Sequence, residues 1–350
     1  MTSVWAQRGP SSSVAKNRLS VLLESGKPLL ADGATGTSLF AMGLTSGDAP
    51  ELWNLEHPER VRELHRGFVE AGADIILTNT FGGNARRLML HGMERRAREL
   101  NRIAAQLARS VADDAGRPVV VAGSVGPTGE LFEPLGMLTE AIAIEVFVEQ
   151  IAGLQDGGAD VAWIETMSSL EEIRAAAVAA ARVGLPFTFT ASFDTAGRTM
   201  MGVTPAALVE FAQSLDPRPI AFGANCGVGA SDLVMSVLGM TAREAGIPVI
   251  AKANAGIPRF VGAQIQYSGT PDLMSEYAHL AVDAGARIIG GCCGTHFEHL
   301  AAMRAALETH RRGARPDEAR VVETLGPLQA PGAPRGHQAA GGAGRRSRRS

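Results

Sequence analysis

The sequence has few of the features that mark membrane, secreted or nucleic-acid-binding proteins. Its 350 residues include three cysteines, an odd number too small for a disulfide framework, which favours a reducing cytoplasm. No apolar run approaches the roughly 20 residues that span a bilayer, and the first residues lack the apolar core of a signal peptide. The formal net charge of −3, with 20% charged residues, excludes a nucleic-acid polyelectrolyte and a wholly disordered chain.

The two ends of the chain differ in composition from the middle. Residues 1–19 hold several serines and no acidic residue, and we expect a flexible N-terminal extension there, with a transit peptide as the alternative. Residues 326–350 are rich in Gly, Pro, Ala and Arg and also hold no acid, a composition typical of disorder. We therefore predict a single domain over residues 20–315 and a low-complexity, basic, disordered tail over residues 316–350.

Eight short runs rich in Val, Ile and Phe recur between these ends. Near-continuous apolar runs of this length are typical of parallel strands that are covered on both faces. Helical stretches lie between the runs, and Pro58, Pro205 and Pro271 each suit the first position of a helix. The runs are Pro28–Thr35, Asp74–Phe81, Pro118–Val125, Asp160–Thr166, Pro186–Phe193, Pro219–Cys226, Pro248–Ala255 and Arg287–Gly294.

The alternation of strands and helices predicts the fold class. Eight strands with intervening helices over about 280 residues indicate an α/β protein with a (β/α)8 TIM barrel. The alternative is an open doubly wound sheet, which normally carries a GxGxxG fingerprint after its first strand. The segment GATGT at residues 33–37 does not match that fingerprint, so we expect the barrel.

Each apolar run ends in polar residues. In a barrel the carboxyl ends of the strands converge on one face, where active sites lie. We therefore expect these residues to surround one site. They are Asp32, Asn79, Ser124, Glu165, Asp194, Asn225, Cys226, Asn254, Cys292 and Cys293.

All three cysteines belong to this predicted face. Cys226 ends the sixth run, and Cys292 and Cys293 end the eighth. The sixth and eighth strands are near neighbours around a barrel, so the three sulfurs could meet. Three thiolates with one open position describe a catalytic zinc site, and soft sulfur ligands favour zinc over magnesium or calcium. The alternatives are three buried small side chains, or a redox pair of adjacent cysteines with a strained disulfide. The adjacent pair flanked by glycines favours zinc.

The chemistry of such a zinc ion favours sulfur alkylation. Three thiolates make the ion electron-rich and a poor Lewis acid for carbonyl groups, whereas its open position suits a fourth thiolate that must stay nucleophilic. Two other classes stay open. One is a non-catalytic zinc or thiol sensor, and the other is a barrel enzyme that binds phosphate at the loop after the eighth strand. Cysteines occupy that loop where bare backbone N–H groups would be wanted, which counts against phosphate.

At these residues the sequence resembles the zinc-dependent homocysteine S-methyltransferases. That family includes betaine–homocysteine methyltransferase and the homocysteine domain of cobalamin-dependent methionine synthase. The pair formed by GANCGVG at Gly223 and GGCCGT at Gly290 is the specific part of the resemblance. The other matching segments, in family order across about residues 20–310, are DGATGT at Asp32, LTNTFGGN at Leu77, GSVGPTGE at Gly123, IET at Ile164 and NAGIP at Asn254.

The resemblance implies a reaction and a ligand set. Cys226, Cys292 and Cys293 would bind zinc, and the sulfur of homocysteine would be the fourth ligand. Coordination lowers the pKa of the substrate thiol and gives a thiolate at neutral pH. That thiolate would attack an activated methyl group in line, and the product would be methionine.

The resemblance also implies which residues bind the amino acid. Glu165 would bind the substrate ammonium, and Asp32 and Gly33 would line the amino-acid pocket. Asn225 precedes a metal ligand and would orient it by hydrogen bonding, with an ordinary strand end as the alternative. Asn254 resembles the family's asparagine on the seventh strand. No function is assigned to Asp194, Lys252 or His296, which we interpret as a turn residue, a partner for an inward acid and a helix-start residue.

The methyl donor is the least determined part of the interpretation. Quaternary ammonium, sulfonium and methylcobalamin all place a methyl group on a good leaving group. Aromatic faces would hold a free cation such as betaine, yet Gly82 and Thr166 stand where the resemblance leads us to expect aromatic residues. Phe81, Trp53 and Trp163 are candidates, with a place in the barrel core as the favoured interpretation of Trp163. These segments look closer to the cobalamin-dependent type, whereas the short chain resembles bacterial proteins assigned as betaine enzymes.

We therefore expect a small 'onium donor, with betaine as the first choice, and a separate methylcorrinoid protein as the alternative. The expected partners are the two small-molecule substrates, with neither nucleic acid nor membrane among them. A homo-oligomer is left open.

Overall fold

Eight parallel strands form the centre of the molecule. The computed structural model describes residues 17–256, 258–261 and 264–329. Each strand overlaps one of the eight predicted runs, so the prediction of strands is confirmed. The strands are β1 (Leu29–Leu30), β2 (Ile75–Leu77), β3 (Val120–Val125), β4 (Val161–Met167), β5 (Phe187–Ala191), β6 (Phe222–Cys226), β7 (Val249–Ala253) and β10 (Ile288–Gly291).

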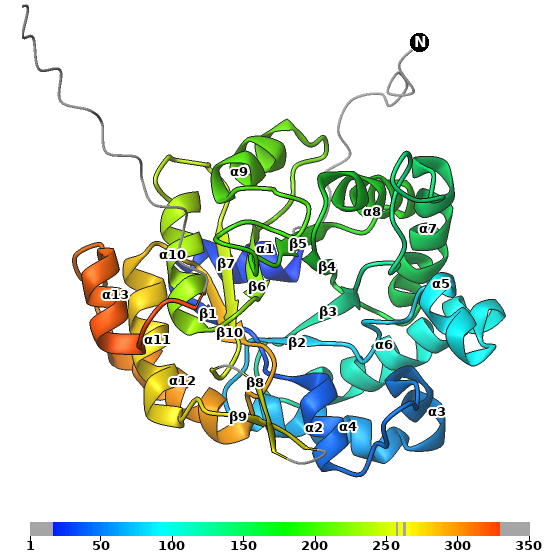
Figure 1. Ribbon diagram of the computed structural model, residues 1–350. Helices are drawn as coiled ribbons and strands as arrows, with labels where there is room; N and C mark the ends of the chain where they lie inside the picture. The colour runs from blue at the N-terminus through cyan, green and yellow to red at the C-terminus, as the bar shows by residue number, and fades with distance from the viewer. Residues whose placement is uncertain (1–16, 257, 262–263, 330–350) are drawn as a thin grey trace, which may run out of the picture.

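The order of the strands is that of a (β/α)8 barrel. The sheet runs β1-β10-β7-β6-β5-β4-β3-β2, so each strand pairs with its neighbour in the chain and β10 pairs with β1. A parallel bridge between Ala31 and Ile75 joins the two ends of this order and closes the barrel. Helices surround the strands (Figure 1). The predicted TIM barrel is therefore confirmed, and the open sheet is excluded.

Helices occupy the connections between the strands. Pro58, Pro205 and Pro271 each start a helix, because the fixed φ of proline suits the first turn, whose N–H groups have no helical partner. The longer helices are α2 (Thr35–Ala41), α4 (Pro58–Glu70), α6 (Ala97–Asp113), α7 (Glu140–Asp156), α8 (Leu170–Val183), α9 (Pro205–Ser214), α10 (Ala230–Met240), α11 (Pro271–Asp283) and α12 (Phe297–Thr309). Short turns α3 (Trp53–Glu56), α5 (Ala85–Leu88), η1 (Pro50–Leu52), η2 (Met89–His91) and η3 (Glu94–Arg96) fill the segments between β1 and α6.

Three segments differ from the expectation. A two-stranded hairpin, β8 (Pro258–Val261) and β9 (Gln264–Tyr267), lies between β7 and α11 and was not predicted. The helix α13 (Glu318–Leu325) falls inside the range predicted to be a disordered tail, and its Val321 and Leu325 side chains are buried. The folded chain therefore extends beyond residue 315, because these two apolar side chains pack onto the outer core. Residues 17–19, the last of the predicted flexible extension, are folded as well, because Asn17 caps the first helix and Leu19 in that helix is fully buried. The rest of the predictions for the two ends falls on residues 1–16 and 330–350, which lie outside the described residues.

The core has two parts, one inside the barrel and one between the strands and helices. Trp163 and Ile250 point into the barrel, whereas Phe189 and Phe222 belong to the outer layer. Buried apolar side chains on both faces of the strands explain why the runs read as almost continuously hydrophobic. Among the described residues, no helix combines the length and the apolar character needed to cross a membrane.

Helix α1 (Arg18–Glu24) closes the amino-terminal end of the barrel. Leu19 is fully buried among the residues that start the strands, including Leu29, Ile75 and Ile288. Asn17 caps the helix by accepting a hydrogen bond from the Leu19 N–H at 2.9 Å. The opposite, carboxyl end of the barrel is therefore the end left for a site.

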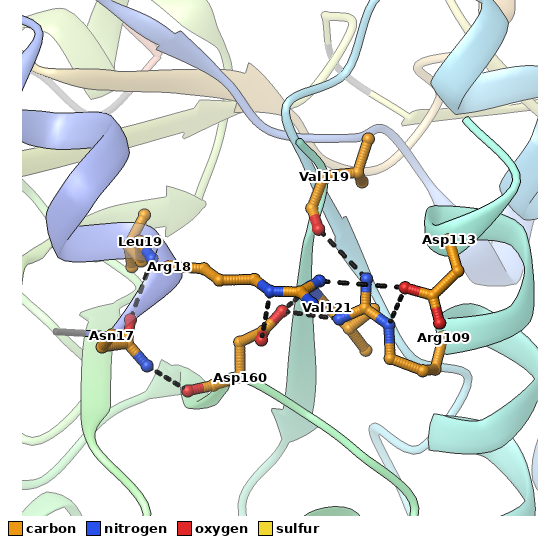
Figure 2. A network of polar contacts seen from close by, with 8 residues as sticks. All are labelled: Asn17, Arg18, Leu19, Arg109, Asp113, Val119, Val121 and Asp160. Carbon is orange, nitrogen blue, oxygen red and sulfur yellow. Dashed lines mark hydrogen bonds and ion pairs between the residues drawn. The ribbon is translucent and has the colours of Figure 1, made fainter. Parts of the chain in front are cut away.

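A polar network fixes this helix to the start of β4 (Figure 2). The Asp160 carboxylate accepts hydrogen bonds from Arg109 Nη1 at 2.9 Å and from the Val121 N–H at 2.8 Å. Arg18 Nε lies 3.6 Å from the other Asp160 oxygen, and Asn17 donates to the Asp160 carbonyl. One partly buried acid thus holds a helix, a strand and a loop together.

We expect Asp160→Ala to lower the free energy of unfolding by about 2–3 kcal/mol, because it leaves Arg109 Nη1 and the Val121 N–H without their acceptor. Asp113→Ala is the matched control. Asp113 contacts the same arginine at 2.9 Å but its side chain is 58% exposed, so its loss should cost less than about 1 kcal/mol. Urea unfolding of both variants measures the difference, and equal losses would contradict the prediction.

The histidine of α4 makes the stability of the fold depend on pH. His65 is fully buried and neither ring nitrogen has a partner among the described residues, so burial lowers its pKa to about 4. The unfolded chain, with an ordinary pKa near 6.5, binds the proton first. Stability from this group is therefore complete above pH 6.5 and is lost as the pH falls toward 4, by about 2 kcal/mol at pH 5. His65→Leu should remove that part of the decline between pH 7 and pH 5, as measured by urea unfolding; an unchanged decline would refute it.

Candidate metal centre and active site

The three cysteines meet at the carboxyl end of the barrel. Cys226 is the last residue of β6, and Cys292 and Cys293 directly follow β10. Their three Sγ atoms all lie within 4.8 Å of one another, and the Cys226 and Cys293 sulfurs are 3.9 Å apart. All three side chains are half-buried and line one cavity. Three converging sulfurs with an open side fit a zinc ion that keeps one position for a substrate.

Asn254, just after β7, holds the two cysteine loops in place. Its Oδ1 accepts a hydrogen bond from the Cys293 N–H at 3.0 Å, and its Nδ2 donates to the Gly227 carbonyl at 2.9 Å. The second bond secures a strained segment, because Cys226 has a φ of 60°, in the left-handed region that residues other than glycine rarely adopt. The asparagine predicted from the seventh strand thus connects both halves of the cysteine cluster.

Asn225 connects the cluster to the end of β4. Its Oδ1 accepts from the Thr166 N–H at 2.9 Å and from Thr190 Oγ1 at 2.7 Å. Its Nδ2 donates to Thr166 Oγ1 at 2.7 Å and lies 3.7 Å from Cys292 Sγ. Four contacts fix the amide. The sulfur beside it belongs to Cys292 and not to Cys226, the ligand that Asn225 precedes and was predicted to orient.

Hydrogen bonds among the thiols control their ionisation. The Cys226 and Cys292 thiols lower the pKa of Cys293 to about 3. Hydrogen bonds with Cys292 and Cys293 in turn raise the pKa of Cys226. Ionisation of Cys293 is therefore favoured, while ionisation of Cys226 is disfavoured. A divalent cation among the sulfurs would supply the positive charge that lets all three become thiolates.

A buried ion pair lies on the barrel side of the cluster. Lys252 Nζ lies 2.7 Å from Asp32 Oδ1, and both side chains are almost completely buried. The other Asp32 oxygen accepts from the Leu77 N–H at 2.6 Å, so both oxygens of this carboxylate have partners. Burial alone would lower the pKa of Lys252, but Asp32 and Glu165 hold it above its ordinary value, so the lysine is charged.

Glu165 faces the cavity from β4. Its Oε1 accepts from the Ser124 hydroxyl at 2.5 Å, and its side chain is buried beside Lys252 and Cys292. Burial raises the pKa of Glu165 to about 7, and the charge of Lys252 limits the rise. A carboxylate with one fixed oxygen in a buried pocket suits a cationic group of a ligand.

The cavity that contains these groups measures about 470 Å³, a volume sufficient for small molecules. Its inner wall is formed by Glu165, Lys252, Ser124 and the cysteines, and its outer wall by residues such as Glu51 and Phe81. The Glu51 carboxylate accepts from the Gly82 N–H at 2.7 Å. The cavity therefore has a polar, sulfur-rich inner half and a mixed outer half.

The three aromatic candidates are not equivalent. Phe81 lines the cavity and is 40% exposed. Trp53 is buried against His57 and under the Arg60 guanidinium, and Trp163 is buried inside the barrel beneath Lys252. Of the candidates, Phe81 alone forms part of the cavity wall.

Of the remaining predicted residues, some line the cavity and others lie outside it. Gly33 lines the cavity, and a side chain there would meet the Thr295 carbonyl at 2.7 Å, so the close approach of the two loops requires glycine. Asp194 lies in an exposed turn and His296 caps α12, as interpreted from the sequence. Lys252 pairs with Asp32, which confirms its interpretation as a partner for an inward acid. It also lines the cavity, which was not predicted, although a lysine within the apolar run PVIAKANA was a signal for a site role.

Comparison with known proteins identifies a family and relatives that this chain resembles. The model of a family described as homocysteine S-methyltransferase matches residues 29–307. Two proteins named methionine synthase, from Mycobacterium tuberculosis and Mycobacterium leprae, are 33% and 30% identical over 307 and 310 residues. These matches cover 83% and 84% of the chain but 25% of each relative, so the chain spans about a quarter of their length.

Comparison with solved structures identifies a protein with a similar fold. The homocysteine methyltransferase MmuM from Escherichia coli is 25% identical, with a TM-score of 0.71 for its oxidized form and 0.70 for its metallated form. Each comparison covers 83% of this chain and 99% of that one.

Replacing any one cysteine of the cluster by serine should lower zinc affinity at least tenfold, because a soft thiolate ligand is lost. Zinc content by elemental analysis should fall from one ion per chain in the wild type to well below one after equilibration with a chelator. Ser192→Ala is a control, since that hydroxyl contacts the Gly227 N–H near the cluster but offers no sulfur. Full zinc retention in one cysteine variant would remove that residue from the ligand set.

Proposed function

The chain belongs to the homocysteine S-methyltransferase family, and on this premise we propose that it transfers a methyl group from a small 'onium donor, betaine first, to the sulfur of homocysteine. With betaine as the donor, the products of this reaction are methionine and dimethylglycine. Cys226, Cys292 and Cys293 hold a zinc ion in this proposal. The observation that carries it is the convergence of three sulfurs on the cavity that also contains Glu165.

The chain's own residues prepare the site for a thiol substrate. When bound, zinc lowers the pKa of a coordinating thiol, so that the substrate sulfur is nucleophilic at neutral pH. Asn225 and Asn254 fix the sulfur ligands before the substrate arrives. Glu165, held by Ser124, receives the ammonium group of homocysteine, and this contact anchors the amino acid with its sulfur toward the cysteines.

Methyl transfer then depends on alignment in the cavity. The sulfur lone pair forms the new S–C bond while the C–N bond of the donor breaks and its electron pair stays on nitrogen. A cavity that holds both reactants in line supplies much of the rate. The groups of the outer wall support a cationic donor, because Phe81 offers an aromatic face and Glu51 a buried carboxylate.

A second donor is favoured by the loops at the carboxyl end of the barrel. Apolar side chains in the segments that follow β2 and β3 are exposed, with Leu90 at 69%, Leu135 at 69% and Met137 at 86%, and Leu90 also lines the cavity. Exposed apolar side chains suit contacts with another macromolecule. A separate methylcorrinoid protein that docks on these loops is therefore the alternative methyl source. The homology to a quarter of two methionine synthases is consistent with it.

Incubation of the zinc-loaded full chain with homocysteine and betaine tests the proposal. We expect methionine and dimethylglycine in equal amounts. Phe81→Ala should raise the KM for betaine about tenfold, as loss of a cation–π contact predicts, and should leave the KM for homocysteine unchanged.

The negative results separate the alternatives. Binding of homocysteine without either product would exclude betaine and leave a sulfonium compound or a methylated corrinoid protein as the donor to be supplied next. Failure to bind homocysteine at all would refute the methyltransferase proposal and favour a zinc or thiol sensor.

A further inference from the structure

Lys252 is a buried cation that opens onto the cavity. The chain has three lysines against 30 arginines, and this one lies on β7 inside the barrel with 2% of its side chain exposed. It lines the same cavity as Glu165 and the cysteines. A lysine is costly to bury, so its position calls for partners that offset the loss of hydration.

The partners on the protein side use part of its hydrogen-bonding capacity. The ammonium carries three N–H donors. One meets Asp32 Oδ1 at 2.7 Å, and the Trp163 ring centroid lies 5.8 Å from Nζ, where a cation–π contact forms. Within the described residues, Asp32 is the one hydrogen-bond acceptor of this ammonium. A donor of Lys252 therefore remains for a ligand in the cavity.

Glu165 provides the opposite charge in the same cavity. Its Oε1 is occupied by Ser124, and Lys252 is not within ion-pair distance of it in the described structure. The two side chains thus present a carboxylate and an ammonium to the same space without neutralising each other by direct contact. An α-amino acid carries the complementary pair, an ammonium and a carboxylate on one carbon.

We propose that Lys252 binds the α-carboxylate of the amino-acid substrate while Glu165 binds its ammonium, so that the pair selects a zwitterionic thiol over simple thiols. The inference rests on the proposed function. Asp32, expected from the resemblance to line the amino-acid pocket, acts in this arrangement as the anchor of Lys252, because both of its oxygens are already engaged.

Truncated ligands test this assignment without any change to the protein. The zinc-loaded full chain is titrated calorimetrically with homocysteine, with an aminopropanethiol that lacks the carboxylate, and with a sulfanylbutanoate that lacks the ammonium. A charge-assisted hydrogen bond contributes about 1.5–3 kcal/mol. Loss of the carboxylate should therefore weaken binding to the wild type about 10- to 100-fold. Equal affinity for homocysteine and the aminopropanethiol would overturn the proposal.

Variants then assign the discrimination to one side chain. Lys252→Met should bind homocysteine no better than the aminopropanethiol, and Lys252→Arg should restore part of the difference. Glu165→Gln should bind homocysteine no better than the sulfanylbutanoate, because the ammonium of homocysteine then has no carboxylate to contact. The exposed Lys27→Met is the matched control and should bind all three ligands as the wild type does.

A purely structural lysine would give a different result. If Lys252→Met weakened all three ligands by the same factor, the carboxylate assignment would be wrong. The double variant Asp32→Asn/Lys252→Met removes both charges of the buried pair together and serves where the single variant does not fold. Wild-type protein that methylates homocysteine but does not discriminate among the ligands would refute this inference and leave the proposed function standing.

Discussion

The site depends on strand β7, because its backbone pairs with β6 on one side and with β10 on the other. This pairing brings Cys226 next to Cys292 and Cys293 across 66 and 67 residues of chain. Asn254, at the end of the same strand, bonds to the loops on both sides. A shift in either register would separate the sulfurs and break the Asn254 bond on that side.

Charge is the second constraint on this end of the barrel. Asp32, Glu165 and the cysteine cluster all bring negative charge into a buried space, and Lys252 is their neighbour of opposite sign. An unpaired charge there would be strongly destabilising. The stability of the inner wall therefore depends on the same charged side chains that would receive a ligand. A metal cation and a zwitterionic substrate would each bring further charges into this group.

The barrel and the cysteine cluster could be predicted from the sequence because both depend on pattern. Eight apolar runs with polar ends specify parallel strands and the face on which they end, and all three cysteines follow such runs. A pairing of Lys252 with an inward acid and a core position for Trp163 were expected, and both are found. The identity of the acid, Asp32, could not be predicted, because the two side chains are 220 positions apart and their orientation depends on the closed barrel. The position of Trp53 depends on the same packing. Helix α13 was missed because its two buried residues stand within a polar segment.

Helix α1 has a consequence for the order of events at the site. By covering the amino end of the barrel, it leaves the carboxyl end as the route to the inner wall. In the proposed reaction, a ligand that reaches Glu165 and the cysteines would pass the outer wall, where the donor is proposed to bind. The thiol would then have to enter before the donor, and the methylated thiol would have to leave after the demethylated donor.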